Sequence, residues 1–196
     1  MGTWAVREAC RQAVAWAEES GAELTVAVNV SPRQLADDGF LAVVEDALAA
    51  AGLPPERLCL EVTESEVVAD PADAVAKLGA LKSLGVHLAI DDFGVGHSSL
   101  SQLKYLVPVD TLKIDKSFID GVTEGGEDEA IVRAVIELAR SVGMTTVAEG
   151  VEQGDQADTL RLLDCGIGQG YHFARPQAAA DVARLLRAGA LGELAA

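Results

Sequence analysis

The sequence predicts an α/β fold built around a parallel sheet, and three observations support that expectation. Apolar runs of strand length alternate with helical patterns through about six units, as in chains of β–α repeats. Glycine or proline closes most of these segments. Polar residues fall at the end of each expected strand, which is the edge where parallel sheets bind their ligands. A chain of 196 residues with this pattern is expected to form one domain.

The expected elements follow from periodicity and from capping signals along the chain. Asp70-Pro71 is typical of a helix start, with Asp as the N-cap and Pro in the first turn. Gly52 and Gly143 are placed to end helices, and Ser31-Pro32 to begin a polar turn. Helical patterns are expected over residues 4–19, 40–51, 70–85, 128–142, 155–164 and 181–187, with a short helix before Pro108. Strands are expected over residues 24–30, 58–62, 86–91, 109–115, 144–148 and 168–173.

Composition limits the classes of function. The formal net charge of −16 argues against binding of a DNA or RNA polymer, which requires a basic face. A small anionic ligand remains compatible with this charge if bound metal offsets it locally. No apolar run reaches the roughly 20 residues that span a bilayer, and the first residues do not form a signal peptide. Three widely spaced cysteines, expected to be small buried side chains, fit a reducing cytoplasm, so a cytoplasmic protein is expected.

The stretch from Leu88 to Gly96 is the most informative part of the chain. An apolar strand ends there in two adjacent carboxylates, Asp91 and Asp92, and a loop with two glycines follows. Adjacent like charges repel one another unless a positive group lies beside them, and divalent cations prefer carboxylate oxygen. The alternative interpretation is a solvated turn in which one Asp caps a helix.

Similar polar groups recur at the other expected strand ends, and this recurrence favours a metal site. Because side chains alternate along a strand, mostly small residues and then a polar residue share one face of each strand, as in a barrel interior with a polar rim. The polar residues are Asn29, Glu61, Glu64, Asp91, Asp92, Lys113, Asp115, Glu149, Glu152 and Gln169. Carboxylates and an amide without a His or Cys cluster favour Mg²⁺ or Mn²⁺. Two such ions can activate water for attack at phosphorus.

Two basic side chains near these acids, Lys113 and His97, are each open to two interpretations. Lys113 is expected to stay charged and to hold an attacking water or a phosphate oxygen; the alternative is an ion pair with Asp115 or Asp91. His87, early in a strand, is expected to be structural. His97, in the glycine loop, either touches a ligand or faces solvent.

Six short motifs occur in order along the chain. They are Asn29-Val30-Ser31, Glu61-Val62-Thr63-Glu64, Asp91-Asp92-Phe93-Gly94-Val95-Gly96, Lys113-Ile114-Asp115, Ala148-Glu149-Gly150-Val151-Glu152 and Gly168-Gln169-Gly170-Tyr171. Together they resemble the EAL domain, the bacterial cyclic di-GMP phosphodiesterase family, over essentially the whole chain. The resemblance implies a TIM-like barrel with one strand reversed. It also implies hydrolysis of one phosphodiester of cyclic di-GMP to linear pGpG, with two Mg²⁺ or Mn²⁺ ions.

The resemblance assigns ligands to both ions. Asn29, Glu61 and Asp91 are expected to hold the first metal ion. Asp91, Asp92 and Glu149 are expected to serve the second, with Asp91 bridging the two.

The remaining matched residues are expected to act around the metals. Lys113 is expected to orient the nucleophilic water, and Glu149 is a further candidate for the base. Glu64 is expected to anchor the loop after Asp92. The residues expected to support the site or contact the nucleotide are Asp115, Glu152 and Gln169.

The chain also departs from the family pattern. It contains no Glu-Ala-Leu, the motif that names the family and whose Glu ligates metal. Only about six strands are expected where a TIM barrel has eight. Residues 1–196 are therefore expected to form one partial EAL domain that lacks the N-terminal strands and has two unpaired sheet edges. Val95 and His97 replace a Thr or Ala and an aromatic residue in a loop that couples metal binding to dimer contacts in the family.

Three interpretations follow from the matches and departures. The chain is an EAL-type phosphodiesterase with activity reduced by the missing Glu, or an inactive module that binds cyclic di-GMP or acts as a protein-interaction scaffold. In the third, it is a fragment of a longer signalling protein with upstream sensory or GGDEF-type domains. The retained Asp91, Asp92, Lys113 and Glu149 favour the enzyme. A homodimer is compatible with each interpretation.

Overall fold

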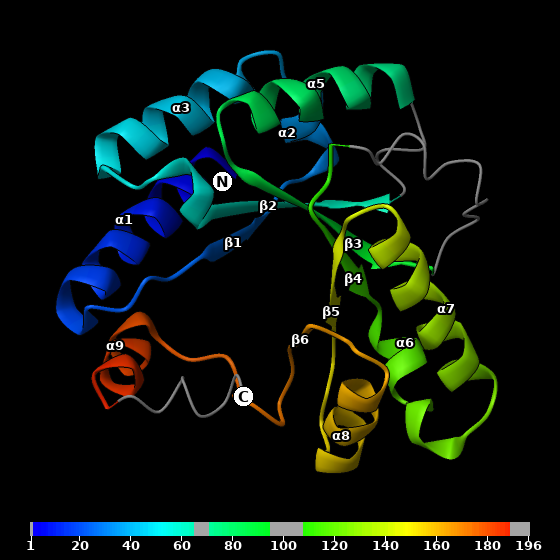
Figure 1. Cartoon of the computed structure of the whole chain (residues 1–196). Coiled ribbons are helices and arrows are strands. Elements are labelled where there is room, and N and C mark those ends of the chain that lie inside the picture. Colours follow the sequence, from blue (N-terminus) through cyan, green and yellow to red (C-terminus); the bar gives the residue numbers. More distant parts are fainter. Residues whose placement is uncertain (1, 65–70, 95–107, 189–196) are drawn as a thin grey trace.

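A computed structural model of the chain describes residues 2–64, 71–94 and 108–188. Within them, a six-stranded sheet runs in the order β1-β2-β3-β4-β5-β6, and every pairing is parallel. The strands are β1 (Val26–Asn29), β2 (Leu58–Thr63), β3 (His87–Phe93), β4 (Thr111–Ile114), β5 (Thr145–Ala148) and β6 (Ile167–Gly168). The sheet curls into an open half-barrel with helices around its outside (Figure 1). This is the incomplete TIM-like α/β barrel that the sequence predicts.

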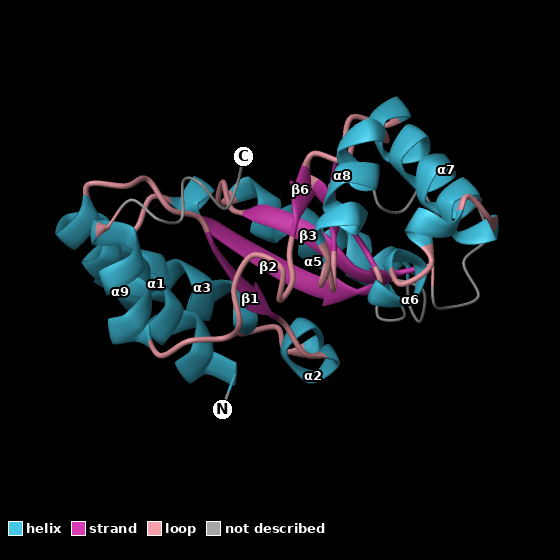
Figure 2. Ribbon diagram, turned by 90° about the horizontal axis from the view of Figure 1, so that it is seen from below, coloured by secondary structure: helices cyan, strands magenta, loops and turns pink. Residues whose placement is uncertain are grey.

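The helices form the outer layer of the half-barrel. They are α1 (Gly2–Ser20), α2 (Pro32–Ala36), α3 (Phe40–Ala51), η1 (Pro55–Arg57), α5 (Pro71–Ser83), α6 (Lys116–Ile119), η3 (Val122–Glu124), α7 (Glu127–Ser141), α8 (Gly154–Leu162) and α9 (Ala179–Arg187). Helix α9 lies beside α1, as Figure 2 shows. The Trp16 indole N–H of α1 donates to the Ala179 carbonyl at 3.1 Å, and Arg187 pairs with Glu19 at 2.5 Å. None of the described helices is long and apolar enough to cross a membrane.

The hydrophobic core lies between the outer face of the sheet and the helices. Leu60, Ile90 and Ile114 point to this side and are fully buried. The opposite, inner face carries mostly small or polar side chains, with Val147 and Ile167 as exceptions, and it is more exposed near the two edges of the sheet. Ala27 on β1 is exposed, and Ile167 on β6 is 55% exposed. A closed barrel would pack this face on all sides.

Most expected elements are present, with ends shifted by one or two residues. The expected strand over residues 168–173 is wrong, because β6 ends at Gly168 and the chain then turns, with the Gly170 carbonyl accepting from Phe173 and Ala174. Ser31-Pro32 begins the short helix α2 as well as a turn. The expectation that all three cysteines are buried is also wrong, because Cys59 and Cys165 are only partly buried. The cap at residue 70, the helix before Pro108, Val95 and His97 lie outside the described residues.

Asp110 ties the N-terminal end of β3 to α5. Lys82 donates to its two carboxylate oxygens at 2.6 and 2.7 Å, and the Leu88 N–H donates at 2.9 Å. Burial alone raises the pKa of this carboxyl, but the hydrogen bonds from Lys82 and Leu88 outweigh burial and hold the pKa below its ordinary value. The stabilisation is therefore fully present above pH about 3.9 and is lost as pH falls through the lower folded pKa.

Asp110→Asn should lower the free energy of unfolding by about 1–2 kcal/mol at pH 7, because it weakens a charged hydrogen-bond set that is partly exposed. Urea unfolding at pH 7 and at decreasing pH measures this, and the difference from the unaltered chain should shrink in acid. Asp38→Asn is the matched control: Asp38 is 98% exposed and lies 3.6 Å from Lys77. We expect it to cost less than about 0.5 kcal/mol. Equal losses in the two variants would contradict the assignment.

The two sheet edges should favour self-association. Within the described residues, β1 pairs only with β2, and β6 pairs only with β5. Edge strands with unpaired backbone groups template association with other chains. We expect light scattering to give a mass well above 20.4 kDa that rises with concentration. A mass of 20.4 kDa at every concentration would show that the edges are protected.

Candidate active site

A β-bulge in β3 presents two adjacent carboxylates on the same side of the sheet. Ile90 pairs with Leu112, and Phe93 pairs with Ile114. Two residues of β3 therefore lie between these pairs, where β4 has one. Asp91 and Asp92 together therefore oppose Lys113. Asp92 has a φ of +54°, a left-handed conformation that is uncommon for a residue other than glycine. Backbone strain of this kind is often found at functional sites.

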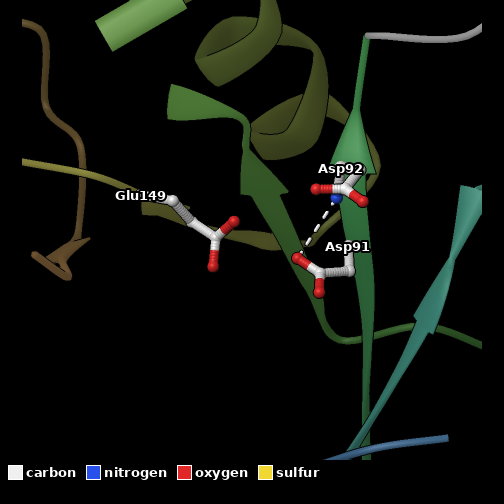
Figure 3. Close-up of side chains that lie close together, drawn as sticks. All are labelled: Asp91, Asp92 and Glu149. Atoms are coloured by element: carbon white, nitrogen blue, oxygen red, sulfur yellow. Dashed lines mark hydrogen bonds between the residues drawn. The ribbon is translucent and has the colours of Figure 1, made fainter. Parts of the chain in front are cut away.

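Glu149 brings a third carboxylate to the same place. It directly follows β5, and its N–H donates to the Ile114 carbonyl at 3.0 Å. One carboxylate oxygen from each of Asp91, Asp92 and Glu149 lies within 4.8 Å of the other two. Figure 3 shows the Glu149 carboxylate directed toward Asp91, while the Asp92 N–H donates to the Asp91 side chain at 3.1 Å. Carboxylates from two strands thus converge at the C-terminal end of the sheet.

Lys113 lies at the centre of the acidic groups. Its side chain is only 5% exposed, and its Nζ lies 2.9 Å from Glu61, 3.0 Å from Asp91 and 2.7 Å from Glu149. Burial alone lowers the pKa of this ammonium, but the hydrogen bonds to the three carboxylates outweigh burial and raise it. The ion pair with Asp91, given as the alternative interpretation of Lys113, is present, and its other partners are Glu61 and Glu149.

The charges of this cluster do not balance. Four carboxylates, Glu61, Asp91, Asp92 and Glu149, surround one ammonium, so full ionisation leaves three negative charges. Burial, followed by the neighbouring Asp91 charge, raises the pKa of Asp92. Burial also raises the pKa of Glu149, against the opposing effect of Lys113. Oxygen ligands with excess negative charge fit a hard divalent cation, so these residues are chemically suited to Mg²⁺ or Mn²⁺.

Glu64 contacts the start of the glycine loop. It lies just after β2, is 6% exposed, and accepts a hydrogen bond from the Gly94 N–H at 3.2 Å. The loop itself, from residue 95 to residue 107, lies outside the described part of the chain.

Four other expected site residues lie at the ends of neighbouring strands or in the segments that follow them, and Asn29 pairs in register with Glu61. Asn29 ends β1 and is exposed. The Asp115 carboxylate caps α6 by accepting from the backbone and hydroxyl of Ser117 at 2.9 and 2.6 Å. Glu152 accepts from Lys116 at 3.0 Å.

Gln169 follows β6 and lines a hollow of about 340 Å³ with Tyr171 and Arg175. The Arg175 guanidinium lies 4.5 Å from the centre of the Tyr171 ring. His87, expected to be structural, has its Nδ1 3.5 Å from Asp110 and lies away from the carboxylate cluster, at the other end of β3.

Two residues beside the site were not expected from the sequence. The stem of Lys116 lies against Gly150, and the ring of Phe118 lies against Gly94. The sequence does contain a signal for both contacts, because each glycine follows a candidate metal ligand within one or two residues. Which side chain would fill the space left by each glycine does not follow from that signal.

The fold and site define a class, namely TIM-like barrel proteins with a carboxylate cluster at the C-terminal ends of their strands. The chain belongs to the EAL domain family, which matches residues 1–176. MucR of Pseudomonas aeruginosa, named a bifunctional diguanylate cyclase/cyclic di-GMP phosphodiesterase, is 41% identical over 179 residues, or 91% of this chain and 26% of MucR. Curated relatives of this kind are much longer, since this chain spans 21–28% of their lengths.

Solved structures share this architecture. The EAL domain of Mycobacterium smegmatis DcpA has a TM-score of 0.90 at 44% identity, over 96% of this chain and 85% of that one. The MucR phosphodiesterase in complex with c-di-GMP has a TM-score of 0.87 at 41% identity, over 92% and 73%. Klebsiella pneumoniae BlrP1, solved with manganese and c-di-GMP, has a TM-score of 0.76 at 34% identity, over 89% and 45%.

Lys113→Met should destabilise the metal-free protein by about 3 kcal/mol, because it leaves three partly buried carboxylates without their cation. Methionine keeps a long apolar stem, so the change is mainly one of charge. Urea unfolding at pH 7 in the presence of EDTA measures the loss. The matched control is Lys77→Met, because the Lys77 ammonium pairs at the surface with Asp38 and Asp73. We expect about 0.5 kcal/mol or less for that variant, and a similar value for Lys113→Met would contradict the central role of its charge.

Proposed function

We propose that this chain is an EAL-type cyclic di-GMP phosphodiesterase domain that hydrolyses one phosphodiester to give linear pGpG. The observation that carries the proposal is the convergence of Asp91, Asp92 and Glu149 beside Lys113 at the C-terminal end of the sheet. Membership of the EAL family supports it, as do the c-di-GMP complexes of MucR and BlrP1.

Two divalent cations, Mg²⁺ or Mn²⁺, complete the proposed site. Asn29, Glu61 and Asp91 would hold one, and Asp91, Asp92 and Glu149 the other, with Asp91 shared. The manganese complex of BlrP1 supports a divalent cation in sites of this family, and the excess negative charge of the cluster supports one here. Bound cations of this kind lower the pKa of water and stabilise charge on phosphate oxygens.

The chain's own residues then position the reactants. Lys113 Nζ has three donors, which contact Glu61, Asp91 and Glu149. In the proposed reaction it would release one of these carboxylates and turn that donor toward the attacking water or a phosphate oxygen. Glu149, whose carboxylate lies 2.7 Å from Lys113 Nζ, accepts the proton that the water loses in this proposal. The water oxygen bonds to phosphorus as the bond from phosphorus to one ribose oxygen breaks, and the leaving oxygen gains a proton. The cyclic substrate opens to a linear dinucleotide.

The surrounding residues have supporting roles in this proposal. Glu64 anchors the loop after Asp92 through the Gly94 N–H. Gln169 borders the hollow beside β6, where it would contact the nucleotide. Glu152 and Asp115 would support the site through Lys116 and α6.

We further propose that residues 1–196 form one partial EAL unit that contributes six strands to an eight-stranded barrel. The exposed inner face supports this, and so do the two edge strands, which each have one neighbour within the described part of the chain. Its proposed partners are a second copy of the chain and sensory or GGDEF-type domains in a longer parent protein. The bifunctional name of the longer MucR supports the second of these.

The purified chain should convert cyclic di-GMP to pGpG with Mg²⁺ or Mn²⁺ and stop when EDTA is added. Asp91→Ala should reduce the rate by about 100-fold or more, because it removes the carboxylate shared between the two proposed cations. Chromatography of the nucleotides follows both species. Asp38→Asn, at an exposed position distant in sequence from the cluster, should leave the rate unchanged.

The outcome of this assay also decides the alternative function. The sequence lacks the Glu-Ala-Leu motif, and this favours a module that binds cyclic di-GMP, or acts as a scaffold, without turnover. Metal-dependent binding with no pGpG would support the binding module and contradict the enzyme. Absence of both binding and hydrolysis would contradict both and leave the scaffold.

A further inference from the structure

The short helix α6 is fixed to its surroundings at both ends. Asp115 caps its first turn through Ser117, and Ile119 at its last position is fully buried. The buried Gln156 side chain donates to the Ile119 carbonyl at 3.1 Å, and its oxygen accepts from the Glu152 N–H at 2.8 Å. Helix α6 is therefore connected to the loop between β5 and α8, in which Glu149 lies. Since it directly follows β4, it also lies next to Lys113 in the chain.

One side chain of α6 supports the backbone that follows the aspartates. Gly94 has a φ of +97°, and a Cβ placed on it would lie 2.9 Å from Phe118 Cε2 and 3.3 Å from Cζ. The ring therefore fills the space that a side chain would take. On the same residue, the N–H donates to Glu64. Gly94 is thus held by a ring and by a carboxylate, two residues after Asp92.

A second side chain of α6 supports the backbone that follows Glu149. Gly150 has a φ of +68°, and a Cβ placed on it would lie 2.6 Å from Lys116 Cβ and 2.7 Å from Cδ. The aliphatic stem of Lys116 therefore lies directly on the Gly150 backbone. Beyond it, the ammonium pairs with Asp120 at 2.7 Å and Glu152 at 3.0 Å. These ion pairs are half exposed, so we attribute the positioning to the stem.

We propose that α6 is a positioning element for the metal site, in which Lys116 and Phe118 set the separation between Glu149 and the Asp91-Asp92 pair. The two side chains stand two residues apart on one short helix, and each presses on a left-handed glycine beside a candidate ligand. A shift of either side chain moves one set of carboxylates relative to the other. The inference rests on the proposed function for its metal site, but it concerns two residues outside the proposed set of metal ligands.

The test is the affinity of the purified chain for Mn²⁺ alone, measured without nucleotide by the electron paramagnetic resonance signal of free Mn²⁺. Phe118→Leu and Lys116→Ala should each weaken binding by about 10-fold or more, as loss of a group that orients a ligand does. Lys116→Met keeps the stem without the charge and should restore most of the affinity lost in Lys116→Ala. Metal-free thermal unfolding of each variant shows whether it is folded.

Phe40→Leu is the matched control, because it removes the same volume from a buried aromatic side chain in α3. It should lower the unfolding temperature while leaving Mn²⁺ affinity unchanged. Unaltered affinity in both Phe118→Leu and Lys116→Ala would overturn the proposal, as would an equal loss in Lys116→Met and Lys116→Ala. If Phe118→Leu does not fold, the two Lys116 variants decide.

Hydrolysis by the unaltered chain tests the proposed function separately, so Mn²⁺ binding without hydrolysis contradicts that function and leaves this test intact. No Mn²⁺ binding by the unaltered chain overturns the positioning role.

Discussion

The ammonium group of Lys113 is buried in the inner face of an open sheet, and the arrangement of the site depends on the carboxylates that pair with it. Burying an isolated amine is costly, but hydrogen bonds to Glu61, Asp91 and Glu149 offset that cost. The same three contacts hold carboxylates from three strands at one place. Lys113 therefore explains how so many acids can converge at one place in the fold. Because the cluster contains more carboxylates than ammonium groups, it keeps an excess of negative charge that a divalent ion can neutralise.

The backbone supplies the second constraint. A regular strand would direct Asp91 and Asp92 to opposite faces, one toward the cluster and one toward the helices. The bulge in β3 keeps Ile90 and Phe93 in the hydrophobic core while both carboxylates stay on the other side. The segment after the bulge is then held by Glu64 and Phe118, which contact the same glycine. Packing in the core and geometry at the site are in this way parts of one arrangement.

Much of this arrangement follows from the sequence, and the exceptions have physical causes. Parallel topology brings strand ends to one edge, so Glu61, Asp91, Lys113 and Glu149 could be expected to meet. The bulge could not be expected. The prediction rests on side chains that alternate between the two faces of a strand, and Asp92 does not follow this alternation.

Local chemistry accounts for the other differences. Asp115 was expected to support the site or contact the nucleotide. Its N-cap contact with Ser117, two residues later, was not anticipated, although the sequence contains the signal for it. Helix α6 has four residues, too few for a periodic pattern. Its Phe118 meets Gly94 across 24 positions of the chain, a contact that only the folded sheet defines.

The bulge has a consequence for how such sites can be lost in evolution. Ile90 and Phe93 already face the same layer, with two residues between them where a regular pleat has one. Deleting a single codon for either aspartate would restore the regular pleat and leave both apolar side chains in the core. The sheet would keep its hydrogen bonds while the site lost a carboxylate and the strained left-handed residue. A descendant that keeps the core but lacks the acidic pair therefore lies one in-frame deletion away.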